Sequence, residues 1–224
     1  MTHAVSRLAS RSAVAFCLIA IAVFSGCQTE ESMKKANGYY QEGLANMEDD
    51  QRQAFVSFQR AIQLNPRHKE AHYSLAHLYT KQGKFQQAEE ELRAVLRIDP
   101  DYSEAHNYLG QILEAQGHWP EAVDQYRQAL RNPLYATPDI ALYRLGRALA
   151  HEGDLEGAMQ NLEDALRVSP PSQPLGQVYL ELGRVYVKLG YSTKAREALT
   201  EVTKLEKGGA NAAAADELLG RLKP

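Results

Sequence analysis

The sequence predicts an all-helical protein built from repeated antiparallel helix pairs, and two spacings carry this prediction. Ala54, Ala88 and Ala122 follow one another at intervals of 34 residues, and Gly83 and Gly117 are separated by the same interval. A fixed period of this length is typical of stacked repeats in which no single unit buries its own apolar face. Charged residues make up 24% and hydrophobic residues 44% of the 224-residue chain, which is ordinary for a globular protein.

The places within the repeat have separate physical roles. Where the two helices of a pair cross, the eighth place holds Gly43, Ala76, Gly110, Gly146 and Gly183. The twentieth place holds Ala54, Ala88, Ala122, Ala158 and Ala195. Small side chains at a crossing let the helix axes approach to about 8–10 Å. The twenty-fourth place holds Phe58, Leu92, Tyr126, Leu162 and Leu199, which we expect to pack on the next unit.

Glycine and proline mark the turns and ends of the predicted helices. Gly83, Gly117, Gly153 and Gly190 stand at the turn inside successive pairs, where a helix-ending glycine is expected. Pro66, Pro100 and Pro170 follow the second helices, since proline cannot continue a helix.

Residues 103–136 read SEAHNYLGQILEAQGHWPEAVDQYRQALRNPLYA, and their offsets match the tetratricopeptide pattern. The chain therefore resembles the tetratricopeptide-repeat (TPR) family over residues 36–207. The resemblance implies a right-handed superhelix of about five helix pairs, closed by a capping helix within 208–224. The expected repeats are 36–68, 69–102, 103–136, 139–172 and 176–207.

Two short segments interrupt the period. Residues 132–139 add two residues to the spacing between Ala122 and Ala158, and residues 169–174 lengthen the next spacing to 37. In the first interruption, Thr137 is expected to be an N-cap with Pro138 at the first helical position.

The N-terminus has the layout of a secretory signal peptide. Arg7 and Arg11 precede an apolar run from Ala13 to Phe24, which is too short to span a bilayer. The run ends in Ser25-Gly26-Cys27, which resembles a bacterial lipobox, although Phe24 replaces the usual Leu. The resemblance implies that residues 1–26 are removed and that Cys27 is lipidated. The alternative is an ordinary signal peptide or a poor membrane anchor.

After the lipidated cysteine, residues 27–35 are expected to form a polar leader ahead of the first repeat. Gln28 stands where inner-membrane lipoproteins of many Gram-negative bacteria carry Asp. By this resemblance the protein is expected in the outer membrane, anchored by lipid and facing the periplasm.

Candidate catalytic and metal-binding residues are sparse. The sequence contains none of the usual nucleophile, phosphate-loop or zinc-protease motifs, so we do not expect an enzyme, a cofactor or a small-molecule substrate. His68 and His72 are one helical turn apart and could form a metal pair, but His72 occupies a packing place of the repeat. The formal charge of −3 argues against nucleic-acid binding.

The inward-facing positions of the first helices predict a partner-binding groove. These positions combine aromatic, apolar and arginine side chains, which are frequent at binding hot spots. The expected groove residues are Asn37, Tyr40, Leu44, Met47, Tyr73, His77, Asn107, Gln111, Tyr143, Arg147, Leu180 and Arg184. The alternative is that the tyrosines only fill space between units. The Lys/Asn clamp with which some TPR proteins grip a C-terminal carboxylate is not evident.

The lipobox, the short leader and the interruption NPLYATPDIALYRLG at 132–146 together resemble the type IV pilus biogenesis lipoproteins of the pilotin type (PilF/PilW). This resemblance implies a scaffold that binds the pilus secretin and promotes its localisation and multimerisation in the outer membrane. The alternative is a TPR lipoprotein that serves another envelope machine, such as a Tad-type pilus, exopolysaccharide export or outer-membrane protein assembly.

Overall fold

The computed structural model describes residues 29–222, and its regular structure within that range is entirely helical. The chain divides into two compact units, one ending at Leu78 and the other beginning at Tyr79. This boundary falls inside helix α3 (Lys69–Lys81), and therefore inside the predicted repeat 69–102.

In the described part of the first unit, a helix covers residues 29–45 and is followed by α2 (Gln51–Leu64) and the first turns of α3. Residues 29–35 of the expected polar leader are therefore part of this helix. The helix is held at its start because the Ser32 hydroxyl donates a hydrogen bond to the Leu64 carbonyl oxygen, 2.8 Å away. At the other end of α2, the Asp50 carboxylate accepts from the backbone N–H groups of Arg52 and Gln53 as an N-cap.

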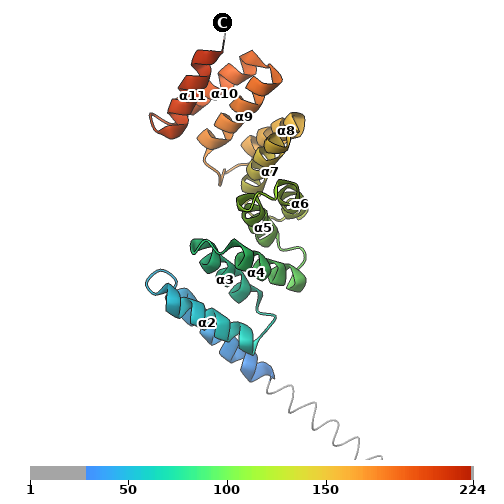
Figure 1. Cartoon of the computed structure of the whole chain (residues 1–224), viewed down its shortest axis with the longest axis vertical. Helices are drawn as coiled ribbons and strands as arrows, with labels where there is room; N and C mark the ends of the chain where they lie inside the picture. Colours follow the sequence, from blue (N-terminus) through green and yellow to red (C-terminus); the bar gives the residue numbers. More distant parts are fainter. Residues whose placement is uncertain (1–28, 223–224) are drawn as a thin grey trace, which may run out of the picture. The chain divides into compact units, whose positions relative to one another are not determined.

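The second unit consists of consecutive helix pairs (Figure 1). Its helices are α4 (Phe85–Ile98), α5 (Ser103–Ala115), α6 (Trp119–Ala129), α7 (Pro138–Glu152), α8 (Leu155–Arg167), α9 (Leu175–Leu189), α10 (Ser192–Leu205) and α11 (Ala210–Arg221). Helices α5 and α6, α7 and α8, and α9 and α10 pack as pairs, and α11 packs on α10 and α9. The predicted helix pairs and the closing helix are confirmed.

The glycines of the eighth place make room for large side chains of their own pair. A Cβ atom built on Gly110 would lie 2.5 Å from Cε1 of Tyr126, and one built on Gly43 would lie 2.5 Å from Cε1 of Phe58. Gly146 and Gly183 stand in the same relation to leucines at the twenty-fourth place. The side chains of the twenty-fourth place therefore lie against the glycine of their own helix pair, and two of them also contact the next helix: Tyr126 interacts with Arg144 of α7, and Leu199 packs with Ala215 of α11.

The turn glycines have a different role. Gly117 has a φ of +82°, and a Cβ atom added to it would meet nothing within 4 Å. Glycine is therefore needed at this turn for its left-handed backbone conformation and not because a side chain would clash. Gly83, Gly153 and Gly190 share the positive φ, which confirms the predicted helix-ending glycines.

Both interruptions of the period are anchored to the helices. In the first interruption, Tyr135 is buried against Ala129 and Ala141. Thr137 occupies the N-cap position of α7, as predicted, but its side chain makes no capping hydrogen bond. In the second interruption, the buried Asp139 carboxylate accepts from the backbone N–H groups of Ser172 and Gln173 at 2.5 and 2.6 Å. The extra residues are therefore held by specific contacts.

Candidate functional site

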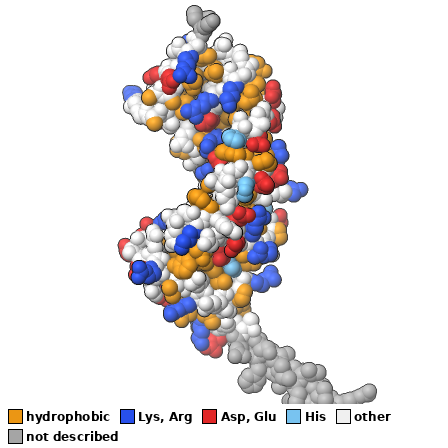
Figure 2. All heavy atoms as spheres, in the orientation of Figure 1, with side chains coloured by type: hydrophobic (Ala, Val, Ile, Leu, Met, Phe, Trp, Pro, Cys, Tyr) orange, Lys and Arg blue, Asp and Glu red, His pale blue; other side chains and the backbone are white. Residues whose placement is uncertain are grey.

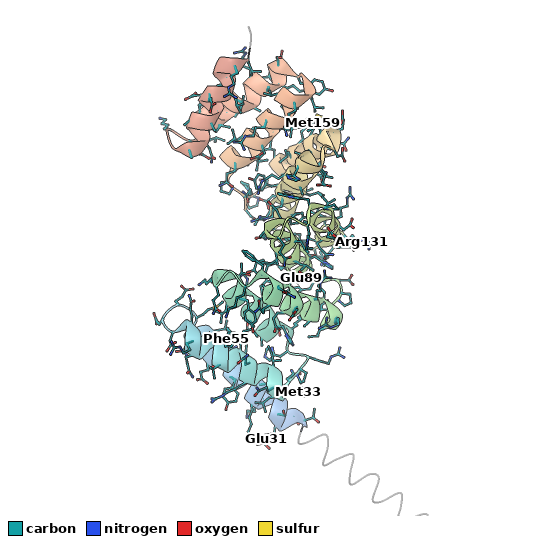
Figure 3. The ribbon with its side chains drawn as sticks, viewed as in Figure 1. Glu31, Met33, Phe55, Glu89, Arg131 and Met159 are labelled. Atoms are coloured by element: carbon teal, nitrogen blue, oxygen red, sulfur yellow. The ribbon has the colours of Figure 1, made fainter. Side chains whose placement is uncertain are left out.

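In the first unit, an apolar stripe runs along one face of the helix over residues 29–45. The predicted groove residues Asn37, Tyr40 and Leu44 are spaced for one helical face, and Met33 continues that face toward the N-terminus. Met33 is 44% exposed and Leu44 is 38% exposed. Figure 3 labels Met33 on this helix and Phe55 on the neighbouring α2. The sequence analysis missed Met33 because it assigned that residue to the leader.

Tyr40 is only partly available on this stripe. Its ring centroid lies 5.9 Å from that of Phe58 and 4.9 Å from that of His68, so the tyrosine also fills space inside the unit. Met47 is half-buried in the turn after the helix. On α3, Tyr73 and His77 lie edge to face with ring centroids 5.0 Å apart.

In the second unit, several predicted groove residues are buried, and this corrects their expected exposure. Leu180 is 4% exposed and packs in a core cluster with Leu199, Val202 and Ala215, beneath the closing helix. Tyr143 and Asn107 are also buried, on α7 and α5. The Asn107 side-chain oxygen has no hydrogen-bond partner within the described chain.

The two predicted groove arginines are already paired. Nη2 of Arg147 lies 3.1 Å from Oε1 of Glu114, and the Tyr126 hydroxyl donates to Oε2 of the same carboxylate at 2.8 Å. The pKa of Tyr126 is raised well above its usual range, mainly by burial and to a smaller extent by the adjacent Glu114 carboxylate. The hydroxyl therefore remains protonated and acts as a donor. Arg184 pairs with Glu181 at 2.6 Å. The Glu114 contacts join α5, α6 and α7, whereas the Arg184–Glu181 pair lies within α9, and both pairs engage arginines that were predicted to face a partner.

One pocket opens beside this network, with a volume of about 330 Å³. It is lined by Thr80, Phe85, Tyr108, Gln111, Ile112, Glu114, Ala115, Trp119 and Arg144. Of the predicted groove residues, only Gln111 lines it. Sequence reasoning missed Arg144 and Trp119 because it drew the groove from a few positions of the first helices, whereas Trp119 begins a second helix. The repeat itself contained a signal, since Phe85 and Trp119 are 34 residues apart at the first position of α4 and α6.

Three family models of the tetratricopeptide repeat match the sequence. One matches residues 45–112 and 80–133, a second matches 109–174, and a third matches 176–208. Together they cover most of the chain. The chain belongs to the tetratricopeptide-repeat family.

Solved TPR structures resemble most of the chain. PilW, described as a widely conserved type IV pilus biogenesis factor, is 24% identical with a TM-score of 0.68, over 84% of this chain and 91% of its own. PilF of Pseudomonas aeruginosa is 23% identical with a TM-score of 0.70, over 87% and 90%. YrrB, a TPR protein with an unusual peptide-binding site, is 19% identical with a TM-score of 0.70, over 84% and 95%. A search of curated protein sequences gives no significant match.

These likenesses establish the TPR fold. TPR proteins are generally non-catalytic scaffolds for protein–protein interaction, and this chain is a TPR scaffold. Among the described helices of this TPR chain, none combines enough length and apolar character to span a bilayer. Cys27, the predicted lipidation site, lies outside the described residues.

The two histidines that could form a metal pair, His68 and His72, are packed inside the fold. His68 and His72 are both buried, and Nε2 of His72 lies 3.2 Å from the Pro66 carbonyl oxygen. His106, the equivalent of His72 in the next repeat, lies between the Gln125 side chain and the Pro100 carbonyl. Within residues 29–222, no group of three or more metal-ligating side chains is arranged to hold an ion.

The burial of His68 leads us to expect that the free energy of unfolding of the first unit decreases in mild acid. Burial lowers the pKa of His68 below its ordinary value of 6.5, against a smaller upward effect of Glu70, and Nε2 has no partner in the described chain. Because the folded pKa is the lower one, protonation favours the unfolded state. The contribution of His68 to the free energy of unfolding is therefore fully present above pH 6.5, the ordinary pKa of histidine. It is lost as the pH falls from there toward the pKa of His68 in the folded protein.

Thermal melting followed by circular dichroism at several values between neutral and mildly acidic pH measures this effect. His68→Gln should flatten the pH dependence, whereas His118→Gln, at an exposed histidine, should leave it unchanged. Equal pH dependence in the parent and in His68→Gln would rule out His68 as the source.

Proposed function

We propose that this TPR scaffold is an outer-membrane lipoprotein that binds the secretin of type IV pili and promotes its localisation and multimerisation. The protein is anchored by lipid on Cys27 and faces the periplasm. The proposal rests on the N-terminal sequence, on the surface of the first unit and on the likeness to two pilus biogenesis proteins.

The observation that carries the proposal is the position of the first helix relative to the lipobox. The described part of this helix reaches back to residue 29, which is two residues after Cys27, and the Ser32 hydroxyl is hydrogen-bonded to the end of α2. Two residues span at most about 7 Å. A lipid on Cys27 would therefore hold the first unit close to the membrane surface, where secretin subunits assemble.

The apolar stripe is suited to a protein partner at that place. Met33 and Leu44 are large exposed apolar side chains on one helical face, with Tyr40 between them. Exposed apolar groups on one face mark interaction surfaces more often than scattered single residues do. We infer that the stripe binds an apolar or amphipathic segment of the secretin.

The likeness to PilW and PilF supports the pilus assignment. It extends over more than four fifths of this chain and about nine tenths of each of those proteins. The role of PilW as a type IV pilus biogenesis factor is transferred to this chain as part of the proposal.

A double substitution tests the stripe. Met33→Ser with Leu44→Ser changes two exposed residues and should leave the helical signal and the melting temperature unchanged. Covering the exposed part of each side chain contributes roughly 1 kcal/mol, so affinity for the secretin should fall about thirtyfold. We expect heat-resistant secretin multimers and surface pili to be lost, measured by immunoblotting and electron microscopy.

Two comparisons complete the test. Leu134→Ser with Leu205→Ser also removes two exposed leucines, 88% and 50% exposed, and should retain the multimer. Cys27→Ala should still bind secretin but should leave the outer-membrane fraction. Normal multimer in the Met33, Leu44 variant would exclude the stripe, and normal outer-membrane fractionation of Cys27→Ala would exclude the lipid anchor. If the secretin assembles in a strain lacking the protein, a different envelope machine is the client.

A further inference from the structure

The lining of the pocket beside the Glu114 network includes aromatic and aliphatic side chains. Phe85 and Trp119 begin successive second helices, and Tyr108 and Ile112 lie one turn apart on α5. The Trp119 ring is held in place because it stacks on His151, with centroids 3.8 Å apart and an interplanar angle of 15°. These side chains provide a preformed apolar contact surface for a partner side chain in a pocket of about 330 Å³.

The remaining lining residues include the charged side chains of Glu114 and Arg144, and the positive charge is in excess because Glu114 is already paired. Both oxygens of Glu114 are engaged, one by Arg147 and the other by the Tyr126 hydroxyl. Glu114 is only 12% exposed, and Arg147 balances its charge within the protein. Arg144 lines the same pocket and interacts with the Tyr126 hydroxyl, but it has no carboxylate within ion-pair distance in the described chain.

The Arg144 side chain contributes a positive charge to the lining of the pocket. Acidic and basic side chains are interspersed on the face shown in Figure 2. The Arg144 guanidinium presents a planar set of N–H donors that suits a carboxylate. Gln111, which also lines the pocket, can donate from its amide. The lining therefore combines donors that suit a carboxylate with aromatic side chains.

We propose that this pocket binds an acidic side chain of an extended partner segment, with Arg144 contacting the carboxylate and Phe85 and Trp119 contacting a neighbouring apolar residue. The inference rests on the proposed function, because it names the chemistry of the segment that a TPR scaffold of this kind would recognise. The occupant is a stretch of protein with Asp or Glu within two residues of an aromatic or large aliphatic residue.

Selection from a random library tests the chemistry without assuming the partner. A phage-displayed library of linear dodecapeptides is selected on the full-length protein in detergent. The parent should enrich peptides with the acidic–apolar combination, and Arg144→Gln should lose the acidic preference. Arg184→Gln is the matched control, because that arginine is also on a first helix but is paired with Glu181. No acidic enrichment in the parent, or the same enrichment in Arg144→Gln, would overturn the proposal.

A titration with a selected peptide gives the magnitude. Trp119 is the single tryptophan of the chain and lines the pocket, so its fluorescence should change on binding. Replacing the acidic residue of the peptide with its amide should weaken binding to the parent by roughly tenfold to a hundredfold, as expected for a charge-assisted contact. Equal affinity for the two peptides would refute the carboxylate contact even if Arg144→Gln fails to fold.

The outcome is separable from that of the proposed function. The library and the peptide pair report on the pocket alone, whereas the secretin multimer reports on the pilus role. Acidic selection together with normal secretin assembly in a strain lacking the protein would retain the pocket and reject the pilus assignment. Loss of secretin assembly in that strain, with no enrichment of acidic peptides in the library, would retain the pilus assignment and reject the pocket proposal.

Discussion

Gly110→Val is expected to destabilise the second unit by about 3 kcal/mol, toward the upper end of the cost of overpacking. A single Cβ on Gly110 would lie 2.5 Å from the Tyr126 ring, and valine adds two further methyl groups. Tyr126 cannot move aside without cost, because it is fully buried and its hydroxyl is bonded to Glu114. Thermal or urea unfolding followed by circular dichroism measures the loss.

Gly38→Val is the matched control for this experiment. Gly38 is also inside a helix, but it is exposed and has nothing within 4 Å of its Cβ position. The same substitution should there change stability by no more than about 0.5 kcal/mol, since only helix propensity is altered. If Gly110→Val melts like Gly38→Val, the close approach of Tyr126 to α5 is wrong.

Glu114→Ala is expected to cost about 2 kcal/mol, because it leaves a buried hydroxyl donor and a half-buried arginine without their shared acceptor. Glu114 joins three helices, since Tyr126 lies on α6 and Arg147 lies on α7. Glu121→Ala, at an exposed glutamate of α6, should change stability by less than about 0.5 kcal/mol.

A double-mutant cycle separates the hydroxyl contact from the ion pair. Tyr126→Phe removes only the hydroxyl and should cost about 1 kcal/mol, while Glu114 keeps Arg147. In the Tyr126→Phe background, Glu114→Ala should cost less than it does in the parent, because one of its partners is already gone. Strict additivity of the two substitutions would show that the 2.8 Å contact contributes nothing to stability.

The sequence by itself determined the repeat architecture of this protein. The spacing of Ala54, Ala88 and Ala122 specified a helix pair every 34 residues, and Gly117 and its equivalents specified the turns. These features could be predicted because they are local: a turn with positive φ selects glycine, and a helix crossing selects a small residue. The closing helix α11 followed from the alanine-rich stretch after the last repeat.

Tertiary structure alone decided which side chains meet and which remain available to a partner. The period places Tyr126, Arg147 and Leu180 on faces of helices, but it does not say that Tyr126 fills the space above Gly110, that Glu114 neutralises Arg147 or that Leu180 lies in the core beneath α11. Each of these contacts joins different helices, so it depends on crossing geometry and side-chain length, which a one-dimensional spacing does not contain. For the same reason Arg144 and Trp119, which share a pocket from α7 and α6, were found only once the helices were packed.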